Sequence, residues 1–264
     1  MNAQDPDRKD FPLWLVIIVV TGLWLFWQVF SSDIYANVLA TLSQGIGITI
    51  MVAVVAYAGA CLLGLGLALA QMSGNYLLRQ AARLYVEIMR GVPIIVLLLY
   101  VAFVLAPSLV TLWNWIGAPF GWEEVRGRDF PLIWRAVIAL TLAYASFLAE
   151  VFRAGLQSVP VGQIEAAKAL GLNRWQRFRF IIFPQAFRTI MPPLGNDFVA
   201  MVKDSSLVSV LGVTDITQLG KVLAAGNFRY FETYNIVALI YLTMTIGLSL
   251  ALRGFEARMR RRKR

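Results

Sequence analysis

Charged side chains lie inside apolar stretches of this sequence, where each costs at least ~2.5 kcal/mol unless it is paired or faces water. Glu150 and Arg153 stand three residues apart in the apolar run 135–156, so they would share one face of a helix and could form an ion pair. Such a pair could be structural only. Alternatively, Glu150 could line a solute path and meet a cationic group of a ligand.

A second polar group surrounds two consecutive prolines, Pro192 and Pro193, in the apolar run 188–213. Its members are Asn196, Asp197, Lys203 and Asp204. Because prolines remove backbone donors, we expect the helix to be broken at this pair, and a broken helix can present free backbone groups to a ligand inside a membrane. The group is therefore a candidate for part of a solute pathway. The alternative is a gate or an intersubunit contact that touches no ligand.

Histidine and cysteine, which often carry catalysis or bind metals, are absent or nearly absent. The sequence contains no histidine, which excludes a histidine general base and histidine metal ligands. Its single cysteine, Cys61, lies in an apolar run and cannot form a disulfide within the chain. The pair Gly220-Lys221 does not complete a nucleotide-binding loop, because Asp215 occupies the earlier glycine position and Val222 replaces serine or threonine. We therefore expect no catalytic, cofactor or metal site, and no ATP hydrolysis by this chain.

The segment 165–184, EAAKALGLNRWQRFRFIIFP, is polar and basic although both of its flanks are apolar. Its alanines favour helix, Gly171 permits a positive φ at a turn, and Pro184 limits continuation of a helix. The segment is therefore predicted to form two short helices joined at the glycine. Three arginines would keep it in water or against an acidic partner: Arg174, Arg177 and Arg179.

The spacing of this segment resembles the EAA loop of the membrane subunits of ABC importers, which reads E-A-A, three residues, G, nine residues, I, one residue, L-P. The matching residues are Glu165, Ala166, Ala167, Gly171, Ile181 and Pro184, and Phe183 stands where leucine is usual. The resemblance implies that the segment is a cytoplasmic coupling helix that docks into a cleft on an ATPase subunit. The docking residues that it implies are Glu165, Ala166, Ala167, Gly171, Leu172, Arg174, Ile181 and Pro184.

Three further stretches, which begin at Glu87, Ser146 and Pro184, resemble the polar amino acid permeases of this class. They read EIMRGVP, SFLAEVFRAGLQSVPVGQIEAAKALG and PQAFRTIMPPLGNDFVAMVKDSSLVSVLGVTDI, and the resemblance extends over about 40–252. Val92, Phe147 and Ser205 depart from the family pattern. The resemblance implies a type I ABC importer (MetI-like) permease that carries histidine, arginine, glutamine or glutamate. It also implies a second permease subunit, the same or homologous, an ABC ATPase dimer and an extracytoplasmic solute-binding protein. The alternatives are another small solute, such as a quaternary amine, sulfonate or phosphonate, or a secondary transporter that works alone.

Composition predicts the fold class. The chain is 59% hydrophobic and 15% charged, with a mean hydropathy of +0.67, which is too apolar for a soluble domain of 264 residues. We expect an all-α polytopic protein with about six transmembrane helices, at 11–30, 42–71, 84–106, 135–156, 188–213 and 233–252. The tryptophan-rich stretch 107–134 is expected to form an interfacial loop or short helix. The predicted organisation is a cytoplasmic tail with an extra helix (1–40), the importer transmembrane domain (41–253) and a basic cytoplasmic tail (254–264).

The net charge of +9 does not indicate nucleic-acid binding, because the basic residues flank the apolar runs instead of forming one face with aromatic residues. If both termini are cytoplasmic, most of the 24 lysines and arginines lie inside, and so does the segment 165–184. The prediction is a multi-pass protein of the bacterial cytoplasmic (inner) membrane, surrounded by membrane lipid.

Overall fold

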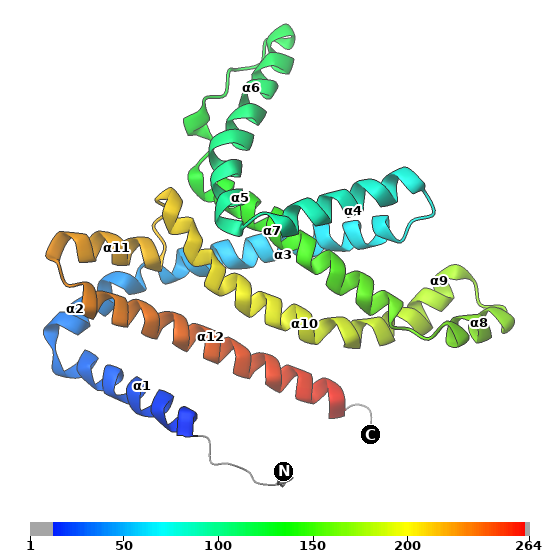
Figure 1. Ribbon diagram of the computed structural model, residues 1–264. Coiled ribbons are helices and arrows are strands. Elements are labelled where there is room, and N and C mark those ends of the chain that lie inside the picture. The colour runs from blue at the N-terminus through cyan, green and yellow to red at the C-terminus, as the bar shows by residue number, and fades with distance from the viewer. Residues whose placement is uncertain (1–12, 262–264) are drawn as a thin grey trace, which may run out of the picture.

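The computed structural model describes residues 13–261, and across this range it consists of helices and connecting turns without a strand (Figure 1). The all-α prediction is therefore confirmed. The basic residues predicted for the two tails lie partly outside the described range, at 1–12 and 262–264.

Four stretches are long and apolar enough to cross a membrane: Asp33–Gln71, Ile94–Phe120, Leu132–Gln157 and Tyr230–Phe255. A fifth is counted if Arg174–Leu211 and Ile216–Asn227, which meet at an angle of 49°, form one broken span. The helix α1 (Leu13–Ser31) covers most of the predicted first span but holds a shorter apolar stretch, Val19–Ser31. Six spans therefore stay a prediction. The connection expected at 31–41 is helical, because α2 (Asp33–Ser43) continues into α3 (Ile46–Gln71) after a bend at Gly45.

The centre of the bundle is the contact between α3 and α7 (Leu132–Gln157). Small residues let these helices approach closely: Ala53, Ala56 and Ala60 are buried, and a Cβ at Gly64 would lie 3.0 Å from the Ala145 carbonyl oxygen. Such residues allow close packing inside membranes, where water cannot drive helix association. The segment 42–71 therefore packs inside the bundle.

The predicted third span, 84–106, is wrong at both ends. Its first residues belong to a separate amphipathic helix, α4 (Tyr76–Gly91). This helix ends because Val92 is extended ahead of Pro93. Contact with the proline ring disfavours helical geometry at the residue before a proline. The apolar span begins at α5 (Ile94–Tyr100) and continues through a π-helical turn, Val101–Leu105, into α6 (Ala106–Gly117). Two tryptophans of the stretch 107–134, which is expected to form a loop or short helix, lie on α6: Trp113 and Trp115. This helix points away from the bundle in Figure 1.

The prediction of a break at Pro192-Pro193 is also wrong. The helix α10 (Phe183–Asp204) runs through both prolines, since their fixed φ is compatible with a helix and only two backbone bonds are lost. A neighbouring helix supports this region, because the Tyr57 hydroxyl of α3 donates to the Leu194 carbonyl (2.6 Å). The break comes later, after the 3₁₀ segment Ser205–Leu211, where Gly212 has φ +78°.

Beyond this break, α11 (Ile216–Asn227) and the long helix α12 (Tyr230–Arg261) complete the fold. A second apolar core joins them to α2 and includes Leu42, Ile216 and Ile236, all fully buried. In Figure 1 this group stands at one end of the molecule. The segment that follows α7 stands at the opposite end.

Candidate functional site

The segment 165–184 folds as two short helices joined at a glycine, as its sequence predicts. The helix α8 (Val161–Ala169) ends in a Schellman motif, in which the Gly171 amide donates to the Lys168 carbonyl (2.9 Å) and the Leu172 amide donates to the Ala167 carbonyl (3.1 Å). This motif requires a left-handed residue, and Gly171 has φ +78°. The predicted positive φ is therefore confirmed.

The next helix, α9 (Arg174–Arg177), begins with a capping box. The Asn173 side chain accepts from the Gln176 amide, and the Gln176 side chain accepts from the Asn173 amide, both at 2.9 Å. A π-helical turn, Phe178–Ile182, leads from α9 into α10. We call the segment from α8 to Pro184, which includes α9 and the π-helical turn, the elbow.

The elbow leaves most of the predicted docking residues accessible. Glu165, Ala166, Gly171 and Arg174 are exposed, Leu172, Ile181 and Pro184 are half-buried, and Ala167 is buried. Two apolar side chains that sequence reasoning missed are more exposed than these suggest: Leu170 is 79% exposed and Trp175 is 69% exposed. The sequence did indicate this exposure, because large apolar residues in a polar turn cannot be buried in a hydrophobic core. An exposed tryptophan beside arginine forms the kind of surface that anchors a protein partner.

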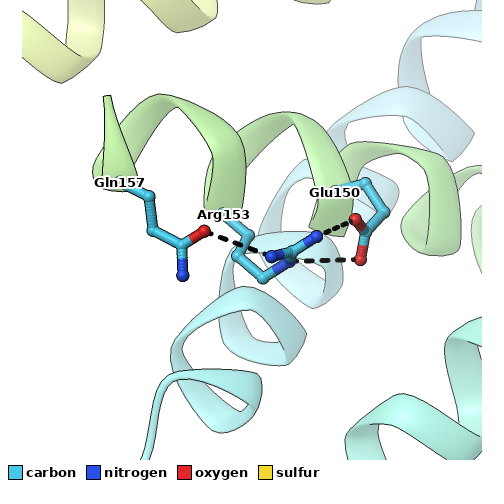
Figure 2. A network of polar contacts seen from close by, with 3 residues as sticks. All are labelled: Glu150, Arg153 and Gln157. Atoms are coloured by element: carbon cyan, nitrogen blue, oxygen red, sulfur yellow. Dashed lines mark hydrogen bonds and ion pairs between the residues drawn. The ribbon is translucent and has the colours of Figure 1, made fainter.

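The polar group on α7 forms the predicted ion pair (Figure 2). The Arg153 guanidinium contacts the Glu150 carboxylate and also donates to the Gln157 side chain (3.1 Å), all along one face of the helix. The side chains of Arg153 and Glu150 remain 34% and 28% exposed. The Glu150 carboxylate is thus compensated within its own helix, and contact with a ligand stays a prediction.

The polar residues of α10 do not gather with Glu150 into one site. Asp204 accepts a hydrogen bond from the Tyr144 hydroxyl of α7 (2.7 Å), and Asp197 is half-buried. Asn196 and Lys203 are exposed instead, and Lys203 lines a groove of about 350 Å³ between α10 and α12. The sequence analysis missed Tyr144, although tyrosine inside an apolar run signals a polar tip that needs a partner.

Comparison with known proteins adds the family. Residues 60–264 match the family described as "Binding-protein-dependent transport system inner membrane component". The glutamine transport system permease protein GlnP of Escherichia coli (strain K12) is 34% identical over 219 residues, which are 83% of this chain and 93% of the relative. The probable amino-acid permease protein YxeN of Bacillus subtilis (strain 168) is 38% identical over 83% of this chain and 91% of its own length.

Solved structures agree with these relatives. The crystal structure of an amino acid ABC transporter with histidines superposes with a TM-score of 0.70 at 34% identity, covering 83% of this chain and 94% of that one. Inward-facing structures of the MetNI methionine ABC transporter give a TM-score of 0.64 at 18% identity, covering 86% of this chain and 98% of theirs, which shows the shared fold. This chain belongs to the family of inner membrane components of binding-protein-dependent transport systems.

Proposed function

We propose that this chain is the membrane-spanning subunit of an ATP-driven, binding-protein-dependent amino acid importer. The observation that carries the proposal is the elbow. This chain belongs to a transport family, and its elbow turns at Gly171 at one end of the bundle, where Leu170 and Trp175 are exposed. An amino acid is the proposed cargo, because relatives at 34–38% identity carry names of glutamine and amino-acid permeases.

The proposed partner at the elbow is a dimer of ABC ATPase subunits on the cytoplasmic side. Closure of that dimer by ATP would move the elbow, and the permease would alternate between inward and outward access. The work comes from the difference in binding energy between those two states, so this chain needs no catalytic residue. We propose that the elbow residues act as the docking surface, through Glu165, Ala166, Ala167, Gly171, Leu172, Arg174, Ile181 and Pro184.

A second permease subunit, identical or homologous, would complete the solute pathway. Support comes from α10, whose Asn196 and Lys203 are exposed although they lie in an apolar helix. Polar groups in such positions face another protein surface or a water-filled path. We propose that the pathway uses Asn196, Asp197, Lys203 and Asp204, with Glu150 near its cytoplasmic end. An extracytoplasmic binding protein would deliver the amino acid, and both termini would lie in the cytoplasm.

The test is reconstitution of the purified chain with the ATPase and binding protein that co-purify with it. Uptake of radiolabelled glutamine, glutamate, histidine and arginine is measured in proteoliposomes with and without ATP. The proposal predicts uptake of at least one of them that requires ATP and the binding protein. Uptake that needs neither would identify a secondary transporter. ATP-dependent uptake of a quaternary amine, sulfonate or phosphonate alone would overturn the amino acid cargo.

A further inference from the structure

The helix α8 is attached to the membrane helices by few polar contacts. Within residues 13–261, one side-chain hydrogen bond joins α8 to another helix. The side-chain nitrogen of Gln185 on α10 donates to the side-chain oxygen of Gln163 (2.6 Å). The same Gln185 nitrogen donates to the Ile181 carbonyl (2.9 Å) at the end of the π-helical turn. Gln185 therefore holds α8 and the start of α10 together at one point.

A second contact lies one helical turn further along α10. Thr189 follows Gln185 by four residues, and its hydroxyl lies 3.3 Å from the hydroxyl of Ser158, which comes just before α8 and donates its own hydrogen to the Gly155 carbonyl (2.7 Å). The single hydrogen of the Thr189 hydroxyl can be donated to Ser158 or to the Gln185 carbonyl (3.3 Å), so the two positions are linked along the helix. We call the contacts Gln163–Gln185 and Ser158–Thr189 the ladder.

An apolar contact lies beside the ladder. Ile164 of α8 packs beside buried Val159, Ala186 and Ile190. A Cβ on Gly155 would lie 2.1 Å from the Ile190 side chain, so α7 and α10 cross there in direct contact. The ladder and this cluster tie α8 to the same two turns of α10.

The next turn of α10 lacks two backbone hydrogen bonds. Pro192 and Pro193 have no amide hydrogen, so the carbonyls of Arg188 and Thr189 lose their partners four residues ahead. Helices bend most readily at prolines. The polar residues Asn196 and Asp197 begin one turn beyond the prolines. A displacement of Gln185 and Thr189 would therefore move the N-terminal part of α10. The helix would then bend directly before Asn196 and Asp197.

From this geometry we infer that Gln185 and Thr189 are positioning residues that transmit movement of α8 to the proline-containing segment of α10. The inference rests on the proposed function, because it gives the elbow a mechanical task in an ATP-driven importer. It adds a specific route: the elbow moves α10 through the ladder, and α10 bends at the proline pair.

The test measures coupling in the reconstituted complex of this chain, its co-purifying ATPase and its binding protein. Uptake of the transported amino acid and ATP hydrolysis are recorded together. In Gln185→Leu and in Gln163→Leu, uptake per ATP hydrolysed should fall about fivefold, the factor that one net hydrogen bond contributes to an equilibrium. Gln163→Leu removes this contact alone, whereas Gln185→Leu also removes the bond to the Ile181 carbonyl, so the double variant should be no worse than Gln185→Leu alone.

Two matched variants separate transmission from general damage. Gln163→Glu keeps an acceptor for the Gln185 amide, so its coupling should stay near that of the wild type. Gln80→Leu makes the same change on exposed α4, at a side chain for which the described residues offer no hydrogen bond, and should have no effect.

Unchanged uptake per ATP in both leucine variants would overturn the inference, as would additive losses in the double variant. Loss of ATPase co-purification in these variants would also overturn it, because the two glutamines would then shape the docking surface instead of transmitting its movement. Failure of the wild-type chain itself to retain an ATPase would contradict the proposed function, which is a separate result.

Discussion

The two ends of this molecule are built differently. At the elbow, α8 and α9 are largely exposed, and the ladder joins α8 to α10 through solvent-accessible polar contacts. At the opposite end, two helix breaks pack against each other: the α2–α3 bend at Gly45 lies on the backbone of Asp215 and Ile216. Asp215 is fully buried there and accepts from the Gln218 amide (2.8 Å) and the Tyr241 hydroxyl (3.1 Å). We call this end the buried joint. The proposed function requires the first end to be moved by a partner, whereas the contacts at the second end join α2, α3, α11 and α12.

The comparison predicts that damage at the elbow abolishes transport but spares folding. Gly171→Val places a β-branched residue at φ +78°, which destroys the Schellman turn. Uptake should fall to background, because the docking surface is no longer presented. The yield of protein and its thermal midpoint should fall little, because the strain at φ +78° is confined to an exposed turn with nothing within 4 Å of a Cβ at Gly171. Normal uptake by this variant would refute the docking assignment.

Damage at the buried joint should do the reverse. In Gly45→Ala, the new Cβ would lie 2.6 Å from the Ile216 nitrogen, so the two breaks must separate. We expect a loss of stability of about 1–3 kcal/mol, as for other overpacked sites. Thermal unfolding in detergent measures it. Gly47→Ala, two residues away with nothing within 4 Å of its Cβ, is the control and should cost nothing. Equal midpoints for the two variants would remove the contrast between the ends.

An intermediate effect is expected at Trp175, which is 69% exposed on α9. Exposed tryptophans at protein interfaces commonly contribute ~2 kcal/mol or more to binding. Trp175→Ala should therefore weaken ATPase binding by about thirtyfold and leave the thermal midpoint of the isolated chain unchanged. Titration of the purified ATPase against immobilised permease measures the affinity. Trp115→Ala on α6, equally exposed but far from the elbow, should bind like the wild type.

The smallest effect is expected for Tyr241→Phe at the buried joint. This change removes the hydroxyl that donates to Asp215 and lies 3.1 Å from the Thr217 hydroxyl. The loss of one net hydrogen bond predicts a destabilisation of ~1 kcal/mol with uptake retained. A drop in uptake larger than the drop in stability would mean that the buried joint also moves during transport.

The sequence predicted the elbow well and the membrane helices less well, for physical reasons. The turn at Gly171 and the Glu150–Arg153 pair depend on residues close together in the chain, so local rules were sufficient. The end of α4 also followed a local rule, but the apolar run beyond Pro93 concealed it. The continuity of α10 through Pro192-Pro193 depends on support from other helices, such as the bond from Tyr57, which no local pattern reveals. The pairing of Asp204 with Tyr144 was hidden for the same reason, since sixty residues separate them.

The central claim is that the elbow faces the cytoplasm and binds an ATPase subunit. Labelling tests it most directly: Cys61→Ala removes the single native thiol, and Leu170→Cys places a new thiol on the exposed turn after α8. A membrane-impermeant maleimide should label this cysteine in inside-out vesicles but not in right-side-out vesicles, and the bound ATPase should protect it. Labelling from the outer face, or labelling that the ATPase does not change, would contradict the account.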